Sequence, residues 1–419
     1  MKHQNPGCGG GHDDPAQPLQ QALARIIPEI RPVDGFECVA TRDALDRVLY
    51  APVLSTVDVP AHTNSAMDGY ALAGADLPAE GERAFGVIGS SFAGHPFDGS
   101  VGAGECVRIM TGATVPAGAD TVIMQERVRR DGDTAFIGAG HRAGDNVRQA
   151  GEDLKAGAVA LEPGARLRPA HLGLIASLGI GEVRVRRRPR VAFFSTGDEL
   201  ASIGQPLGPG QIYDSNRYTL FGMLARLGVE VIDLGVVRDT REDLEQAFEL
   251  AAAQADAVIT SGGVSVGEAD FVTETLDKIG DVGFWTVAIK PGRPVAFGRV
   301  HGALFFGLPG NPVSVMVTFY QLVQPALEAL AGVTEPAPPA LLRAALETRV
   351  RKKPGRREFQ RGILRAAPDG GYTVATAGRQ GSGILRSMAE ANCFIVLPED
   401  CGSLEPGAEV QVQPFAGLC

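Results

Sequence analysis

The sequence of 419 residues contains no run of apolar residues that approaches the ~20 needed for a membrane-spanning helix. Its amino terminus also lacks the basic and then apolar stretch that marks a secretory signal. We therefore expect a cytoplasmic protein with no role in a membrane.

Cysteine is scarce, and no two cysteines form a C-x-x-C pair. This pattern favours reduced, mostly buried thiols over disulfides or a zinc site. His3, Cys8 and His12 lie in a glycine-rich segment that offers ligands for a transition metal, but such composition is more typical of a disordered tail. The cysteines are Cys8, Cys38, Cys106, Cys393, Cys401 and Cys419.

Positive charge is also in deficit, since the formal net charge is −10. This balance argues against a general binder of nucleic acids or membrane surfaces. An anionic small molecule stays possible, because a local cluster of Lys and Arg outweighs the global sign at short range.

Both common nucleotide-binding signatures are missing: no G-x-x-x-x-G-K-[ST] occurs, and no G-x-G-x-x-G joins a strand to a helix. A glycine-rich loop is nevertheless present at 261–270, directly after the apolar stretch 256–260. Its glycines let backbone N–H groups approach phosphate oxygens, and Glu268 and Asp270 suit a hard cation. The loop predicts a phosphate and metal site, with an ordinary surface turn as the alternative.

The length and the changes of texture along the chain predict several domains. Strands and helices alternate over 189–331, which predicts a doubly wound α/β domain with strands at 191–194, 230–234, 257–259, 295–297 and 303–306. Its helices should begin near Ser215, Thr240, Asp270 and Asn311, where Asn311-Pro312 is a strong start signal. We assign 1–18 to a flexible tail, 19–60 with 151–188 to a first domain, 61–150 to an inserted β-rich domain, and 335–419 to a small β-barrel or sandwich. Helical spacing within the first domain appears at 19–30, at 41–50 with Thr41 as N-cap, and at 169–178.

Polar residues follow several of the predicted parallel strands, and these strand ends meet at one edge of an α/β sheet. Glu199 and Asp239 come after the first two strands, and Pro309-Gly310-Asn311 follows the last. Carboxylates gathered there would repel one another, and a bound Mg²⁺ would relieve that repulsion. The alternative for Asp239 and Asp270 is capping of the helices that follow them.

Three further positions are weaker candidates when each is taken alone. Lys290, one of only six lysines, lies between an apolar run and a turn. Its ammonium could bind an oxyanion there, and the alternative is a lysine that merely extends to solvent from a strand end. Asp68 and Thr111 lie in the β-rich segment, where β-turns explain both residues adequately.

Six segments together resemble the motif series of the molybdopterin molybdenumtransferases, or molybdenum insertases. Their order and spacing cover about residues 19–415. The segments are Ser65-Ala66-Met67-Asp68-Gly69-Tyr70, Arg108-Ile109-Met110-Thr111-Gly112, Ser195-Thr196-Gly197-Asp198-Glu199-Leu200, Ser261 through Asp270, Lys290-Pro291-Gly292 and Leu308-Pro309-Gly310-Asn311-Pro312.

The resemblance implies a multidomain α/β plus β chain: an extended first domain, an inserted β domain, a molybdopterin-binding α/β domain and a C-terminal β-barrel. It implies a homodimer whose cleft combines the α/β domain of one subunit with the inserted domain of the other. The implied reaction joins adenylylated molybdopterin and molybdate, with Mg²⁺ as cofactor, to give molybdenum cofactor and AMP. Contacts with molybdopterin adenylyltransferase and with molybdoenzyme maturation factors are implied as well.

The family's functional positions match particular residues of this chain. The implied catalytic residues are Asp68, Thr111, Glu199, Asp239, Asp270 and Lys290, with Glu199, Asp239 and Asp270 as metal ligands. The substrate-binding residues that we expect are Gly262, Gly263, Ser265, Gly267, Arg293, Pro309, Gly310, Asn311, Arg361 and Ser382.

One departure from the family pattern concerns the phosphate and molybdate charge. A second lysine that is often found in the family is Thr286 here, and Arg293 is the nearest cation to replace it. Three alternatives stay open: insertion of tungstate, a molybdopterin adenylyltransferase that uses a similar α/β domain, and a non-catalytic scaffold on the same fold.

Overall fold

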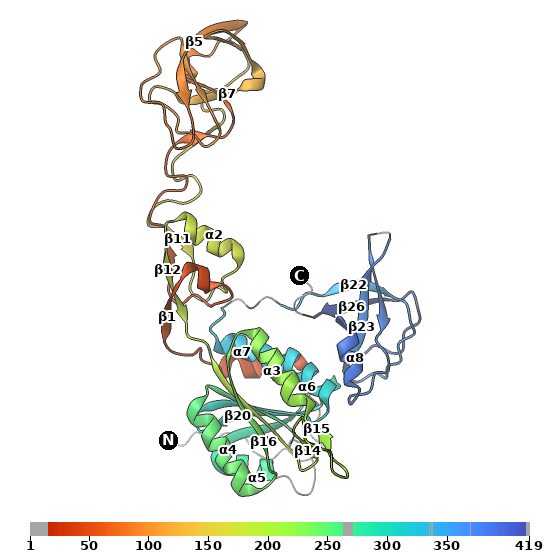
Figure 1. Ribbon diagram of the computed structural model, residues 1–419. Coiled ribbons are helices and arrows are strands. Elements are labelled where there is room, and N and C mark those ends of the chain that lie inside the picture. Colours follow the sequence, from red (N-terminus) through yellow and green to blue (C-terminus); the bar gives the residue numbers. More distant parts are fainter. Residues whose placement is uncertain (1–15, 263–270, 335, 337, 369, 416–419) are drawn as a thin grey trace, which may run out of the picture.

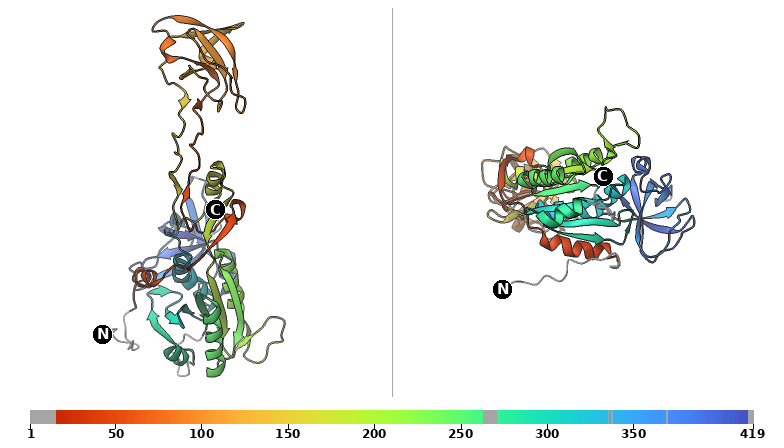
Figure 2. Two further views of the ribbon diagram at one scale, coloured as in Figure 1. Left: turned by 90° about the vertical axis from the view of Figure 1, so that its left-hand side faces the viewer. Right: turned by 90° about the horizontal axis from the view of Figure 1, so that it is seen from below.

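The computed structural model describes residues 16–262, 271–334, 336, 338–368 and 370–415. An α/β domain lies at one end of the molecule with a β-barrel beside it (Figure 1). From there an elongated first domain leads to a β-rich inserted domain at the far end, joined by two thin chain segments (Figure 2). The expected fold class, multidomain α/β plus β, is confirmed.

A six-stranded sheet of order β16-β13-β17-β21-β20-β18 forms the centre of the α/β domain. The first four strands are parallel, β20 runs antiparallel to β21, and the edge strand β18 runs antiparallel to β20. The sequence predicts every strand except β18, whose glycines interrupt its apolar pattern. The strands are β13 (Arg190–Thr196), β16 (Glu230–Val237), β17 (Ala257–Ser261), β18 (Gly280–Thr286), β20 (Pro294–Val300) and β21 (Ala303–Leu308).

Helices cover both faces of this sheet, as expected of a doubly wound domain. Alternate residues of β13 divide between two cores: Phe193 joins one, and Phe194 joins the other. The helices of the first core are α1 (Leu19–Ile26), α3 (Ser215–Leu227), α6 (Pro312–Thr318) and α7 (Gln324–Leu330). The helices of the second core are α4 (Arg241–Gln254) and α5 (Phe271–Ile279). The four predicted helix starts in this domain are therefore correct to within one residue.

One helical stretch, Pro312–Leu330, is long and apolar enough to cross a membrane by length and composition alone. It comprises α6, a π-helical turn over Phe319–Val323 and α7. Because 67% of its apolar window is buried inside the protein, it is a helix of the α/β core.

The barrel closes through five strands in the order β23-β24-β22-β26-β25 and back to β23. These are β22 (Leu342–Leu346), β23 (Arg357–Ala366), β24 (Tyr372–Thr376), β25 (Cys393–Leu397) and β26 (Glu409–Pro414), with helix α8 (Leu385–Glu390) beside them. A short strand from the α/β segment, β19 (Ile289–Lys290), adds to β23 in parallel. Phe359, Met388 and Phe394 of the barrel also belong to the α/β core, so the two domains pack as one body.

The first domain is built from chain segments on both sides of the insertion. Strand β1 (Phe36–Ala40) pairs with β12 (Glu182–Arg186), β2 (Val53–Leu54) pairs with β11 (Val159–Leu161), and α2 (Pro169–Ser177) packs against them. The predicted helix at 41–50 is wrong: only a 3₁₀ turn, Thr41–Ala44, forms. Asp46 then adopts a positive φ of 61°, and Thr41 donates its hydroxyl to the Ile180 carbonyl and caps no helix.

A six-stranded sheet of order β7-β4-β6-β5-β9-β8 makes up the inserted domain. Its strands are β4 (Gly69–Leu72), β5 (Glu82–Ser91), β6 (Glu105–Ile109), β7 (Thr121–Met124), β8 (Val128–Asp131) and β9 (Thr134–Gly138). At its base, β3 (Asn64–Ser65) pairs with β10 (Val147–Arg148). The neck below consists of two chain segments, which are joined by a bridge between Val59 and Leu154 and by further backbone hydrogen bonds, such as the one from the Gly151 N–H to the Pro60 carbonyl.

The four cysteines that the structure describes are free thiols, as the sequence predicts. Burial raises the pKa of Cys106 and of Cys393 to about 12. The reactive thiolate is therefore scarce at neutral pH, and both side chains act as small apolar residues of the core.

Candidate active site

The carboxyl ends of the four parallel strands lie at one edge of the α/β sheet. Ser195 on β13 is in register with Ser261 on β17, and Ser261 is in register with Leu308 on β21. The segments that follow these strands, which carry Glu199, Gly262 and Pro309 through Asn311, therefore begin side by side. The structure thus brings together Glu199, Gly262 and the segment 309–311 among the candidates that the sequence places in the α/β domain.

Gly262 opens the glycine loop and has a backbone that only glycine adopts easily. Its φ is +93°, and a Cβ at this position would lie 2.5 Å from the Thr196 carbonyl oxygen. Its N–H donates to the Leu308 carbonyl at 3.2 Å, which ties the loop to the neighbouring strand. Gly263, Ser265, Gly267 and Asp270 lie outside the described residues.

A buried asparagine that sequence reasoning missed connects two of these strand ends. Asn216, near the start of α3, donates from Nδ2 to the Ser261 hydroxyl at 2.8 Å and to the Gly310 carbonyl at 2.7 Å. Asp214 is the N-cap of the same helix and accepts from the Arg217 N–H. The polar triplet at 214–216 before an apolar helix was the available signal, but it predicts only a helix start.

The candidate metal ligands that the structure describes are two carboxylates that follow neighbouring strands of the sheet. Glu199 is exposed after β13, and Asp239 is half-buried after β16. The capping alternative for Asp239 is wrong, because Thr240 is the N-cap of α4 and accepts from the Asp243 N–H at 3.3 Å. Among the described residues no three His, Cys, Asp or Glu side chains converge on one point. Carboxylate oxygens of this kind suit Mg²⁺, with Asp270 as the third expected ligand.

Lys290 lies on the wall of a cavity between the α/β domain and the barrel. The cavity has a volume of about 270 Å³ and is lined from the α/β side by Lys290 and Pro291. Its barrel side is formed by Arg349, Arg351, Glu358, Phe359, Gln360, Arg361, Thr376 and Gln380. Four cations thus face a single carboxylate, which favours an anionic ligand.

The carboxylate in this cavity, Glu358, is almost fully buried and has a partner for each oxygen. Lys290 Nζ lies 3.0 Å from Oε1, and Gln360 Nε2 donates to Oε2 at 3.0 Å. Because Lys290 is half-exposed and Glu358 is on β23, this pair holds the ammonium at the cavity wall. The alternative of a lysine that merely extends to solvent does not describe this arrangement.

Arg361 is a buried cation without a carboxylate partner among the described residues. Its Nε donates to the Ser387 hydroxyl at 3.0 Å, and its Nη2 donates to the Arg379 and Gly381 carbonyls. Burial lowers the pKa of Arg361 to about 10, because desolvation disfavours the charged form. An anion in the cavity would supply the missing counter-charge.

The barrel loop beyond Arg361 reaches the start of α6. Asn311 is the N-cap residue and Pro312 occupies the first turn, as predicted, although the Asn311 side chain makes no capping hydrogen bond. The Val313 N–H instead donates to the Ser382 carbonyl at 3.0 Å. The helix start that we expected to receive an anion therefore has one of its N–H groups occupied by the barrel loop.

The positions next to Lys290 do not all face the cavity. Arg293 is exposed on the same hairpin but is not among the lining residues that the structure describes. Thr286 lies at the end of β18, where its carbonyl accepts from the Gln17 N–H at 2.9 Å. Among the described residues, Arg349, Arg351 and Arg361 of the barrel are the additional cations that line the cavity, and Arg349 is paired with Glu405.

Asp68 and Thr111 lie together in the inserted domain. Asp68 Oδ1 accepts from the Thr111 N–H at 2.8 Å and from the Thr111 hydroxyl at 2.7 Å. The backbone bond first, and then the hydroxyl bond, lower the pKa of Asp68. Within one chain this exposed pair is far from the α/β sheet (Figures 1 and 2).

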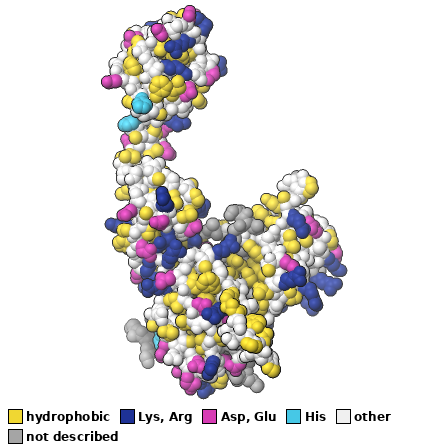
Figure 3. All heavy atoms as spheres, in the orientation of Figure 1, with side chains coloured by type: hydrophobic (Ala, Val, Ile, Leu, Met, Phe, Trp, Pro, Cys, Tyr) yellow, Lys and Arg dark blue, Asp and Glu magenta, His cyan; other side chains and the backbone are white. Residues whose placement is uncertain are grey.

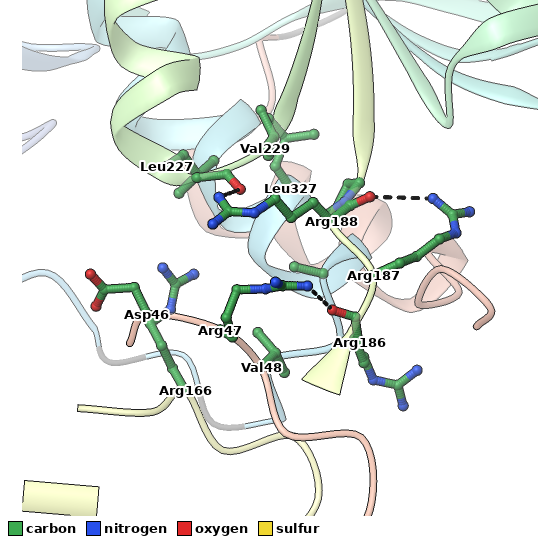
Figure 4. A pocket seen from close by; sticks show the side chains of 13 residues that line it. Asp46, Arg47, Val48, Arg166, Arg186, Arg187, Arg188, Leu227, Val229 and Leu327 are labelled. Atoms are coloured by element: carbon green, nitrogen blue, oxygen red, sulfur yellow. Dashed lines mark hydrogen bonds between the residues drawn. The ribbon is translucent and has the colours of Figure 1, made fainter. Parts of the chain in front are cut away.

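A second pocket, of about 30 Å³, lies where the first domain joins the α/β domain (Figure 4). Arginines line it, but their N–H groups already donate to oxygen atoms of the protein. Arg47 donates to the Arg186 carbonyl at 2.9 Å, and Arg188 donates to the Gly228 carbonyl at the end of α3. Arg187 binds both oxygens of Asp256. None of the predicted site residues is here, and the contacts make it a structural joint.

Three family descriptions match this chain in order. Residues 17–179 match the "MoeA N-terminal region (domain I and II)", residues 192–329 match the "Probable molybdopterin binding domain", and residues 343–415 match the "MoeA C-terminal region (domain IV)". A molybdopterin molybdenumtransferase of Haemophilus influenzae is 45% identical over 402 residues, which cover 96% of this chain and 99% of the relative. The chain belongs to the molybdopterin molybdenumtransferase family. The resemblance inferred from the six segments is thereby confirmed.

Further relatives agree with this assignment. A molybdopterin molybdenumtransferase of Nostoc is 36% identical and covers 93% of this chain and 91% of its own length. A solved molybdopterin biosynthesis MoeA protein from Pyrococcus horikoshii is similar at a TM-score of 0.80 and 30% identity, over 96% of this chain and 100% of that one. Similarity along nearly the whole chain includes the first, inserted and barrel domains as well as the α/β domain.

Proposed function

We propose that this chain inserts molybdenum from molybdate into adenylylated molybdopterin, releasing AMP and forming molybdenum cofactor. The observation that carries the proposal is the cation-lined cavity at the junction of the α/β domain and the barrel. Membership of a molybdenumtransferase family agrees with it. The near-complete match also favours insertion over an adenylyltransferase, which needs only the α/β domain.

The cavity and the sheet edge are linked by a continuous series of contacts, which supports one site. Arg361 binds the Gly381 carbonyl, Ser382 binds Val313 at the start of α6, and Asn216 joins Gly310 to Ser261. We assign the oxyanion to the cavity and the phosphates and pterin to the loops at the sheet edge. The main task of the protein is then to hold two anions that would otherwise repel each other.

We further propose that Glu199, Asp239 and Asp270 hold Mg²⁺ when the substrate is bound. Oxygen donors at adjoining strand ends fit this cation, which prefers carboxylates and substrate phosphates. The bound ion would polarise the phosphoanhydride and offset its charge. Lys290, Arg351 and Arg361 would neutralise molybdate on the other side.

A homodimer forms part of the proposal, because Asp68 and Thr111 are too far away to join the sheet edge of their own chain. A flap formed by β14 (Leu200–Ala201) and β15 (Ile212–Tyr213), together with α3, exposes Ile203, Ile212, Tyr218 and Phe221 beside that edge. Figure 3 shows apolar side chains gathered over this part of the α/β domain. Such a surface suits a partner subunit.

A mixed dimer tests the shared cleft. An Asp68→Ala chain and a Glu199→Gln chain, each inactive as a homodimer, should regain some activity when combined, because one cleft of each heterodimer receives both intact halves. Mixed dimers that form but stay inactive would contradict the shared cleft. Wild-type chain that fails to restore a molybdoenzyme in a cofactor-deficient host would contradict insertion itself, and tungstate supplied in parallel identifies the preferred metal.

The remaining expectations rest on the sequence. We propose a cytoplasmic enzyme that contacts molybdopterin adenylyltransferase, its supplier of adenylylated substrate, and molybdoenzyme maturation factors. The match of all four parts to molybdenumtransferases disfavours a non-catalytic scaffold.

A further inference from the structure

The barrel carries a concentration of positive charge, of which the proposed reaction uses only Arg351 and Arg361. Seven cations and one carboxylate occupy residues 349–361, in a chain whose net charge is −10. The adjoining turn at 398–405 adds three carboxylates, Glu399, Asp400 and Glu405. The surface formed by these two segments is therefore still positive, and Figure 3 shows Lys and Arg side chains gathered on this part of the barrel.

The cations of this segment differ in how they are neutralised. Arg349 is paired with Glu405 at 2.9 Å, and Arg357 with Glu399 at 3.3 Å. Lys352 is buried and donates its three N–H groups to backbone carbonyls. Lys353 and Arg356 are exposed at the tip of the turn, and the structure gives neither of them a carboxylate partner.

This turn is fixed at the rim of the oxyanion cavity. The Arg357 N–H donates to the Ala288 carbonyl at 2.9 Å, and Lys290 is in register with Glu358 through the β19–β23 pairing. On its other side, Gln360 Nε2 donates to the Arg351 carbonyl at 3.1 Å, and both residues line the cavity. Lys353 and Arg356 therefore project from the two ends of a short turn whose neighbours form the cavity wall.

We propose that Lys353 and Arg356 form an anion-collecting surface that guides polyphosphate-bearing small molecules into the cleft formed by this cavity and the adjoining loops at the sheet edge. The inference rests on the proposed function, because it takes the pyrophosphate-bearing nucleotide substrate as its ligand. Exposed, uncompensated charges at the mouth of a site raise the local concentration of an opposite charge and increase the rate of association. Their effect is confined to low and moderate salt, since the Debye length is about 8 Å at physiological ionic strength.

The experiment compares Lys353→Gln/Arg356→Gln with a matched control, Arg31→Gln/Arg42→Gln. The control removes two exposed cations of the amino-terminal region, so the change in net charge is equal. The first readout is calorimetric binding of ADP, a stable pyrophosphate-bearing nucleotide, at 20 mM and 300 mM NaCl. We expect ADP affinity to fall at least about threefold in the barrel variant at low salt, with little difference at high salt and none in the control.

The second readout is molybdenum cofactor formation as a function of salt. The barrel variant should lose kcat/KM for adenylylated molybdopterin at low salt and keep kcat, because neither residue lines the cavity. Equal ADP binding by wild type and barrel variant at low salt would overturn the proposal and leave the charged turn to a macromolecular partner. A third outcome separates the two proposals. If the barrel variant binds ADP less tightly but the wild-type protein forms no molybdenum cofactor, the anion-collecting surface is supported and molybdenum insertion is refuted.

Discussion

Replacing Arg361 by methionine tests whether this arginine serves a ligand or the fold. Lowering its pKa from the ordinary arginine value to about 10 means that charged Arg361 destabilises the folded protein by about 3 kcal/mol. Methionine removes that cost but also removes three hydrogen bonds, each worth about 1.5 kcal/mol because the donor is charged. Two of the acceptors keep another interaction, because Gly381 still accepts from the Ile384 N–H and the Ser387 hydroxyl still donates to the Ile384 carbonyl. The terms nearly cancel, so Arg361→Met should change the free energy of unfolding by less than about 2 kcal/mol.

The ligand-bound state should respond very differently. Molybdate at about 100 times its Kd stabilises a protein by about 2.7 kcal/mol. Loss of a hydrogen bond to a charged group weakens binding by about 1.5–3 kcal/mol, which is roughly tenfold or more. Urea unfolding with and without molybdate, followed through the single tryptophan, Trp285, measures both quantities. Arg365→Met, on the exposed end of β23, is the control and should keep the full stabilisation by molybdate.

The pH dependence gives a separate check on the sign. Because the folded-state pKa of Arg361 lies below the unfolded value, its destabilising effect is complete below about pH 10 and fades as the pH rises toward the pKa of the unfolded chain. Wild type should therefore gain stability relative to Arg361→Met over that interval. A loss above about 4 kcal/mol at neutral pH, or undiminished stabilisation of the variant by molybdate, would refute the reasoning.

Three other substitutions follow from the site geometry. Thr111→Val removes the hydroxyl that donates to Asp68 but keeps the backbone N–H, which has the larger effect, so the pKa of Asp68 should rise while staying below its ordinary value. NMR titration of the Asp68 carboxyl measures this pKa, and an unchanged value would contradict the account. Gly262→Ala places a Cβ 2.5 Å from the Thr196 carbonyl oxygen, so it should lower the melting temperature and abolish activity. The control Gly310→Ala has nothing within 4 Å of its Cβ and should fold normally, and equal melting temperatures of the two variants would show that the loop backbone adapts. Thr286→Lys, which restores the family lysine, should lower the KM for molybdate if position 286 reaches the anion, and an unchanged KM would leave Arg351 as the substitute cation.

The α/β domain was predictable because its strands are continuous apolar runs and its helices have explicit start signals. Asn311-Pro312 and Thr240 begin helices where their chemistry indicates. The segment at 41–50 was mispredicted because apolar spacing alone does not separate a helix from a chain that pairs with a sheet. Leu49 bridges to Val185 and packs in the first-domain core, so tertiary contacts determine its extended conformation.

Of the candidate site, local sequence identified the residues at strand ends but not their partners. Glu358 lies 68 positions from Lys290 in the sequence, and Asn216 lies 94 positions from Gly310. Contacts of this range arise only when β19 adds to the barrel and α3 packs across the sheet. The Asp68–Thr111 pair is similar, since β4 and β6 must pair before two unremarkable turn residues meet.

The two halves of the proposed cleft are attached to the α/β domain in opposite ways, and this difference suits the reaction. The barrel shares a hydrophobic core with the α/β domain and is joined to it by β19, so the cations of the cavity are held in fixed positions. The inserted domain is joined only through a thin neck of two chain segments, where Val59 and Leu154 form a bridge. A rigid anion site keeps its charges oriented before the substrate arrives, which is where electrostatic stabilisation acts most strongly. A domain on a thin neck can in turn bring Asp68 and Thr111 to a partner's site and withdraw them after reaction, so its movement would govern access to the cleft and release of the product.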